Sequence, residues 1–265
     1  MTSIQGIRNL ISLTEIDLRF NKLKRKLNDM NDLFELINIE YLSLSDNILS
    51  GHIPYAINQL KNLKKIRLSN NLIHGLLPAF EEHPQLSFID LSNNNIGGEI
   101  KSTFLQSFNN VTEEIFIDVS SNFITGSVPS ALSRFHHLNL RIESNRIKNI
   151  DPSLCEKNNW NNGNVGKYHC DGIACSQGYF NELGRQIDDT YCLPCDTSFF
   201  LGSTSCNGIE NASELPTKTT TKRKLVWLIL GTVVLFGNIA ICVIIFFNSN
   251  TYAYDVLEND TSYEV

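Results

Sequence analysis

Apolar residues recur along the chain at fixed distances from an asparagine. In four copies the apolar positions lie eight, five and three residues before that asparagine and two residues after it. Two further copies keep the last three positions but have Glu114 and His137 at the first. The anchoring residues are Asn21, Asn47, Asn71, Asn94, Asn122 and Asn145. A regular period of this size predicts six stacked units, each with one short strand and a return arc.

Composition supports a structural role for the recurring asparagine. The chain of 265 residues contains 31 asparagines, far more than an ordinary globular protein uses. An asparagine placed where the chain turns out of a strand has an amide that both donates and accepts hydrogen bonds. We therefore expect these side chains to pair with buried backbone groups that would otherwise remain unpaired.

A second motif follows the asparagine in several units. Gly51–Pro54, Gly75–Pro78 and Gly126–Pro129 read glycine, any residue, apolar, proline, and Gly98–Ile100 keeps the motif without the proline. This element resembles the plant-type leucine-rich repeat of receptor-like proteins and receptor kinases, over roughly residues 7–150. A resemblance to microalgal, diatom-like membrane leucine-rich-repeat proteins is also noted. The resemblance implies a right-handed α/β solenoid of six repeats over residues 1–150.

The outward-facing strand positions are the candidate ligand-binding site, because the concave sheet of a solenoid is its extended binding surface. Phe88 and Phe116 should be neighbours on adjacent strands, as should Asp90 and Asp118. These pairs favour a peptide, protein or glycan ligand, and the carboxylates suit a cation; an ordinary mixed-polarity face is the alternative. The candidate residues are Tyr41, Lys65, Arg67, Phe88, Asp90, Phe116, Asp118 and Arg141.

Six of the seven cysteines lie in residues 151–206, which we interpret as a disulfide-rich cap on the solenoid. They are Cys155, Cys170, Cys175, Cys192, Cys195 and Cys206. Six cysteines allow 15 pairings. The segment is similar to the cysteine-rich modules of ephrin-receptor-like ectodomains, which implies the pairs Cys155–Cys170, Cys175–Cys192 and Cys195–Cys206. Zinc is the competing interpretation, with His169 nearby, but only Cys192 and Cys195 have the tight spacing that zinc sites favour. We therefore expect no metal and no cofactor.

The C-terminal part predicts a membrane anchor. Residues 207–224 are a Ser/Thr/Pro-rich stalk, 225–247 are 23 uncharged residues that suffice to span a bilayer, and 248–265 form a short acidic tail. Asn238 lies near the middle of the span, where a hydrogen bond to a second copy or a co-receptor would satisfy its amide. Asn110 and Asn211 begin N-glycosylation sequons. Tyr254 and Leu257 have the spacing of an endocytic sorting signal in a cytoplasmic tail.

Two rules disagree about which side of the membrane carries the repeats. Disulfides, sequons and stalk place residues 1–224 outside the cytoplasm, whereas Lys222, Arg223 and Lys224 favour the inside. We favour the outside, because long domains cross membranes largely regardless of flanking charge. The repeats begin almost at Met1, without a leader or a capping segment, so we expect a chain truncated at its N-terminus.

These features predict a non-catalytic, single-pass plasma-membrane protein that recognises a ligand and signals, if at all, through a partner. The formal charge of −6 argues against nucleic acid. No nucleophile–base pair, phosphate loop or metal triad is recognisable, so we do not expect an enzyme. The alternatives are a structural or adhesive surface protein and a tail-anchored scaffold with cytosolic repeats.

Overall fold

A computed structural model describes residues 7–206, which lie within one compact unit, Met1–Asn211. Within these residues, no helix is both long and apolar enough to cross a bilayer. The predicted stalk, span and tail lie outside the described residues, as do Asn211, Asn238, Tyr254 and Leu257.

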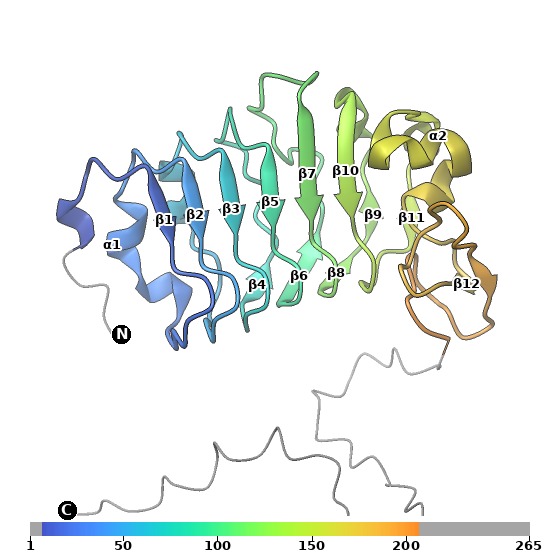
Figure 1. The fold of residues 1–265 in the computed structure, drawn as a ribbon, viewed down its shortest axis with the longest axis horizontal. Helices are drawn as coiled ribbons and strands as arrows, with labels where there is room; N and C mark the ends of the chain where they lie inside the picture. The colour runs from blue at the N-terminus through green and yellow to red at the C-terminus, as the bar shows by residue number, and fades with distance from the viewer. Residues whose placement is uncertain (1–6, 207–265) are drawn as a thin grey trace, which may run out of the picture. The chain divides into compact units, whose positions relative to one another are not determined.

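The principal sheet has six parallel strands in the order β1-β2-β3-β5-β7-β10, one from each predicted repeat (Figure 1). Their bounds are β1 Glu15–Asp17, β2 Tyr41–Ser43, β3 Lys65–Arg67, β5 Phe88–Asp90, β7 Glu114–Asp118 and β10 His137–Arg141. β7 and β10 are two residues longer than the others at their N-terminal ends. The sequence pattern placed all six strands correctly.

A second parallel sheet lies behind the first and was not predicted (Figure 1). It consists of β4 His74–Leu76, β6 Asn95–Glu99 and β8 Phe123–Thr125, and a separate pair is formed by β9 Ser127–Val128 and β11 Asn149–Ile150. The glycine of the Gly-x-apolar motif falls here. Gly75, Gly98 and Gly126 all have positive φ, and a Cβ on Gly126 would lie 2.8 Å from the Glu99 side chain. The motif therefore makes room for the side chain of the preceding repeat.

The return arcs are built mainly from 3₁₀ turns. They comprise η1 Ile7–Asn9, η2 Leu27–Asp29, α1 Asn31–Phe34, η3 Tyr55–Gln59 and η4 Ser130–Arg134. Pro54 and Pro129 stand at the N-caps of η3 and η4, where the fixed φ of proline starts a turn and its missing N–H costs nothing. Each of these helical elements has five residues or fewer, so the helical component of the predicted α/β class is short.

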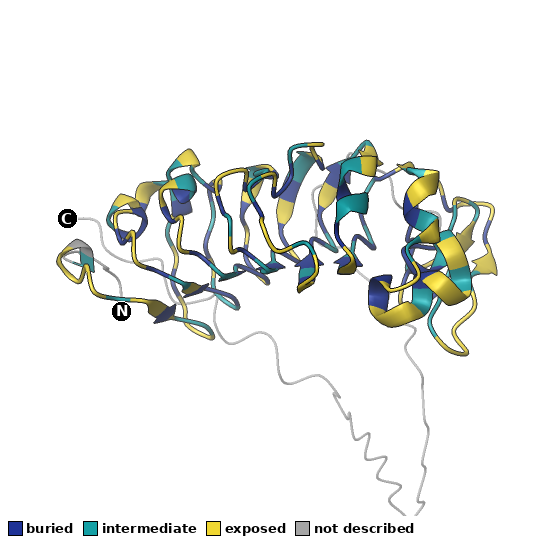
Figure 2. Ribbon diagram, turned by 90° about the horizontal axis from the view of Figure 1, so that it is seen from above, coloured by how far each residue is buried: buried dark blue, intermediate teal, exposed yellow. Residues whose placement is uncertain are grey.

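The core is a stack of apolar layers between the two sheets and the arcs (Figure 2). Within it, the repeated asparagines pair with backbone as predicted. Asn71 donates from Nδ2 to the carbonyls of Leu44, Leu68 and Ser69, and its Oδ1 accepts from the Leu49 N–H at 2.9 Å. The same arrangement recurs at Asn47, Asn94, Asn122 and Asn145. Each asparagine therefore satisfies an amide of the repeat before it.

The cap covers the C-terminal end of the repeats. Its elements are η5 Pro152–Glu156, η6 Trp160–Gly163, α2 Asn164–Tyr168, η7 His169–Gly172 and the antiparallel pair β12 Tyr179–Phe180 and β13 Leu193–Pro194. The disulfides are Cys155–Cys170, Cys175–Cys192 and Cys195–Cys206, the pairs that the ephrin-receptor-like resemblance implies. The cysteines weighed as zinc ligands are thus all engaged in disulfides. Trp160 is fully buried, and its Nε1 donates to the Phe135 carbonyl at 2.9 Å.

The turn of η6 closes the exposed edge of β10. Asn161, Asn162 and Gly163 have consecutive positive φ values of 50°, 58° and 86°, a conformation that asparagine and glycine tolerate best. This backbone path brings the Asn161 side chain to β10, where its Oδ1 accepts from the Leu140 N–H at 2.7 Å. An asparagine outside the repeat pattern thus supplies an acceptor where a further strand would otherwise lie.

A buried ion pair joins the last repeat to the cap. Glu143 occupies the position that holds serine in four earlier repeats, and Arg185 comes from the cap. Arg185 Nε lies 3.1 Å from Glu143 Oε1, with the two side chains 11% and 8% exposed. Burial raises the pKa of Glu143 to about 7, against the opposing effect of the Arg185 charge. Burial also lowers the pKa of Arg185. Burial therefore disfavours the charged form of both side chains.

Candidate ligand-binding site

The principal sheet brings the predicted site residues into two columns. Its register pairs Phe88 with Phe116 and Asp90 with Asp118, which confirms the predicted neighbours. On either side, Lys65 pairs with Phe88 and Asp118 with Arg141.

Four of these residues form one continuous stack, which we call the aromatic–arginine row: Arg67, Phe88, Phe116 and Arg141. The two phenyl rings are stacked, with centroids 4.7 Å apart and an interplanar angle of 16°. The Arg67 guanidinium lies 4.6 Å from the Phe88 centroid, and that of Arg141 lies 5.4 Å from Phe116. Because β3 and β10 flank β5 and β7 in the sheet, each ring has a cation on one face and the other ring on its second face. The two guanidinium groups therefore lie at the two ends of the ring stack, and each contact of this kind stabilises by about 0.5–2 kcal/mol.

The carboxylates beside the row accept hydrogen bonds from serine side chains. Asp90 accepts from the Ser92 and Ser69 hydroxyls at 2.8 Å, and Asp118 accepts from the Ser120 hydroxyl at 2.6 Å. Burial raises the pKa of Asp118, which is 8% exposed. These contacts make the two carboxylates internal acceptors rather than the outward-facing cation site that the sequence suggested.

The cations of the row are less fully satisfied. Within the described residues, the buried Nε atoms of Arg67 and Arg141 have no hydrogen-bond partner. Arg141 lies 3.9 Å from Asp118, and 43% of its side chain is exposed. The accessible character at the centre of the sheet is therefore cationic and aromatic.

The remaining candidates extend the row toward the N-terminal repeats. Lys65 lies 4.9 Å from the Phe88 ring and 5.8 Å from the Tyr41 ring, so it bridges the two aromatic side chains. Tyr41 is 37% exposed. The structure thus brings all eight predicted residues together on the neighbouring strands β2, β3, β5, β7 and β10. Asp90 and Asp118 stand two residues along their strands from Phe88 and Phe116.

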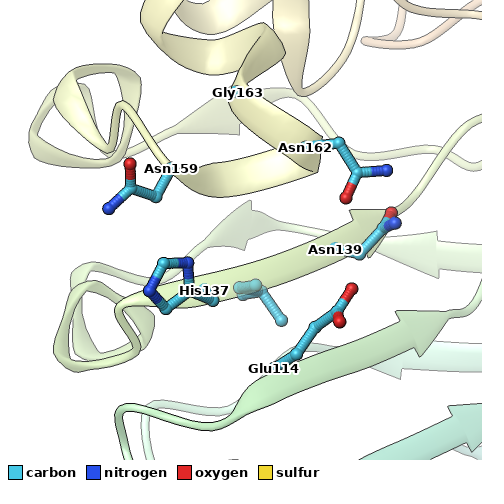
Figure 3. A pocket seen from close by; sticks show the side chains of 7 residues that line it. Glu114, His137, Asn139, Asn159, Asn162 and Gly163 are labelled. Atoms are coloured by element: carbon cyan, nitrogen blue, oxygen red, sulfur yellow. The ribbon is translucent and has the colours of Figure 1, made fainter.

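The longer fifth repeat adds two pockets at the N-terminal rim of the sheet. One, of about 510 Å³, is lined by Tyr41, Lys64, Lys65 and Glu113 among others. The other, of about 340 Å³, lies between β7, β10 and η6 (Figure 3). Its polar side chains, which define what we call the acceptor pocket, are Glu114, His137, Asn139, Asn159 and Asn162.

Sequence reasoning did not identify the acceptor pocket. One signal was present, because Glu114 and His137 occupy the position that is apolar in the first four repeats. Both side chains are exposed, and Ile115 and Leu138 take over the buried place one residue later.

The first predicted glycosylation site lies on the loop before β7. Asn110 is exposed, and its Oδ1 accepts from the Thr112 hydroxyl at 2.9 Å. It also lines the 510 Å³ pocket.

Comparison with known proteins identifies the class of the repeats. A family profile described as leucine rich repeat matches residues 37–96, and a second leucine-rich-repeat profile matches residues 85–110. Together with the sheet and its asparagine ladder, these matches show that residues 37–110 consist of leucine-rich repeats.

Two curated relatives from Arabidopsis thaliana narrow the class. Receptor-like protein CLAVATA2 is 30% identical over 86 residues, which are 32% of this chain and 12% of the relative. Receptor-like protein 39 is 34% identical over 100 residues, which are 37% of this chain and 11% of the relative. Over these segments, the repeat region is similar to plant leucine-rich-repeat receptor-like proteins. This chain spans about an eighth or less of the length of either relative.

A solved structure supports the same fold. The leucine-rich-repeat ectodomain of the plant membrane receptor kinase GASSHO1/SCHENGEN3 from Arabidopsis thaliana was determined in complex with CASPARIAN STRIP INTEGRITY FACTOR 2. It superposes with a TM-score of 0.52 and 25% identity, over 60% of this chain and 19% of that chain.

Proposed function

We propose that this protein is a non-catalytic receptor-like protein that binds a peptide, or an extended segment of a protein, on its concave sheet. The observation that carries this proposal is the aromatic–arginine row, which places two guanidinium groups around stacked phenyl rings at the centre of the sheet. Arginine and aromatic residues at the centre of a surface are the side chains that most often dominate binding energy.

The chemistry of the row favours an anionic group on the ligand. The neighbouring carboxylates are occupied by serine hydroxyls, whereas 43% of the Arg141 side chain is exposed. A carboxylate accepts well from a guanidinium fork. Since both ring faces are covered, a sugar ring has no aromatic face to stack on, and this disfavours the glycan alternative.

The arrangement in the cell follows from the predicted C-terminal segments. We propose a single-pass plasma-membrane protein with the repeats outside, the tail in the cytoplasm and signalling through a partner protein. Three disulfides in the cap and an exposed sequon at Asn110 support the outside placement.

A peptide selection tests the proposal. The purified full chain is incubated with a random octapeptide library, and the bound peptides are sequenced. We expect enrichment of Asp and Glu that weakens at high salt. We also expect a loss of affinity of about tenfold or more in the double variant Arg67→Ala/Arg141→Ala.

The matched control removes two cations elsewhere. Lys101→Ala/Lys148→Ala makes the same change in net charge outside the concave sheet, and it should bind the selected peptides like the unmodified protein. Equal losses in both double variants would reduce the effect to overall charge and contradict a specific site at the row.

A further inference from the structure

The acceptor pocket differs in chemistry from the rest of the concave face. It contains one carboxylate, one imidazole and three amides, and no lysine or arginine lines it. Glu114 makes no ion pair within the described residues. Every polar side chain in the pocket can accept a hydrogen bond, so the pocket suits a group that carries several N–H donors and a positive charge.

Three of the polar side chains face the same region of the pocket. Figure 3 shows the Glu114 carboxylate directed toward Asn139, with the Asn162 amide facing the same region from η6. The register of β7 and β10 places His137 beside Glu114. Asn139 Oδ1 is buried and has no hydrogen-bond partner within the described residues.

Other ligand types fit less well. An anion would meet the Glu114 carboxylate without a lining cation to offset it. A divalent metal prefers several carboxylate oxygens, whereas within residues 7–206 no three His, Cys, Asp or Glu side chains gather in a way that could hold a metal ion.

The pocket lies within reach of a ligand bound at the aromatic–arginine row. Asn139 pairs in register with Phe116, which pairs with Phe88. Two strand spacings of about 4.8 Å separate β5 from β10, which is about three residues of extended peptide. A peptide with an anionic group at the row can thus place a cationic group in the pocket.

We propose that the acceptor pocket binds the ammonium or guanidinium group of the peptide ligand, about three residues from the anionic group held at the aromatic–arginine row. The inference rests on the proposed function and adds a polarity: the acidic part of the ligand lies over β5 and β7, and the basic part lies against β10 and η6. The cation is either the free N-terminus of the peptide or a Lys or Arg side chain.

The octapeptide library tests this polarity with a matched pair of variants. The unmodified full chain should enrich a basic group about three positions from an acidic one, and Glu114→Gln should reduce that enrichment by about threefold to tenfold while keeping the acidic preference. Glu35→Gln removes an exposed carboxylate outside both pockets and should change nothing. A parallel library with acetylated N-termini distinguishes the terminal ammonium from side chains. Equal basic enrichment in the unmodified chain and in Glu114→Gln would overturn the inference and leave the proposed function standing.

A direct titration tests the pocket independently of the row. Nα-acetyl-arginine amide is added to the full chain at millimolar concentrations, and the ring resonances of His137, assigned by their loss in His137→Asn, are followed by NMR. We expect these resonances to shift in the unmodified protein and in Glu35→Gln, and not in Glu114→Gln. No shift in the unmodified protein overturns the pocket, even where library peptides bind at the row.

Discussion

At the scale of the single residue, the repeated asparagine contributes most to the fold. Asn94 donates to the carbonyls of Leu68, Leu91 and Ser92 and accepts from the Ile73 N–H. These groups are buried, so removing the amide leaves several of them unpaired at once.

Substitution of two adjacent asparagines should distinguish this hydrogen-bonding role from a general effect of losing an asparagine. Asn94→Ala should lower the free energy of unfolding by about 2–4 kcal/mol, because the backbone groups left unpaired cannot reach water. Asn95→Ala changes the adjacent residue, which is exposed, and should stay within about 0.5 kcal/mol. Thermal unfolding of the two variants checks this, and similar midpoints would contradict the ladder role.

The residue scale also shows where the sequence was informative. The asparagine pattern predicted the strands and the Phe88–Phe116 neighbours, because each depends on local spacing alone. The stacking of Arg67 and Arg141 on those rings depends on rotamers chosen among side chains of four strands, which spacing does not specify. The roles of Asp90 and Asp118 were also missed. Their serine partners Ser92 and Ser120 stand two residues later, and that local signal was available.

At the scale of the element, the joint between the last repeat and the cap is the most sensitive to pH. Glu143 has a folded-state pKa of about 7 against 4.5 as its ordinary value. The folded protein therefore binds more protons than the unfolded chain between these values. Its contribution to stability is fully present below pH 4.5 and is lost as the pH rises through 7.

A charge-neutral variant should remove this dependence. Glu143→Gln should flatten the fall in stability between pH 4.5 and 8, by about 3 kcal/mol at most. Glu182→Gln, an exposed carboxylate of the same cap, should retain the pH profile of the unmodified protein. Unfolding midpoints measured across this pH range test the prediction. A Glu143→Gln profile as steep as that of the unmodified protein would show that a different group titrates.

Elements that close on distant partners were harder to predict from the sequence. The second sheet was missed because β4 and β6 contain glycines, which are poor strand formers. The contacts of the η6 turn were not predicted from the sequence. Its function depends on Asn161 reaching Leu140, 21 residues earlier in the chain.

At the scale of the whole molecule, the oxidation state of the cysteines indicates which compartment the repeats occupy. Six of the seven are paired in the structure, and the seventh, Cys242, lies outside the described residues. Denaturing alkylation without reductant, followed by intact mass, should therefore add one label per chain. Seven labels would indicate a reducing compartment and would favour the cytosolic, tail-anchored scaffold over the receptor-like protein.

The asparagine ladder also gives the chain a direction. Each unit is completed by a side chain that is synthesised later, in the unit that follows it, and the series ends when the cap supplies Asn161 and the Gly202 carbonyl to the strand edge. Whole units can accordingly be duplicated or lost within the series, because the asparagine hydrogen bond that joins a unit to the next one is the same at each junction. Repeats cannot be added at the C-terminal end, since a unit placed beyond the cap would find no open strand edge. Changes in the length of such a chain over evolution should therefore occur ahead of the cap.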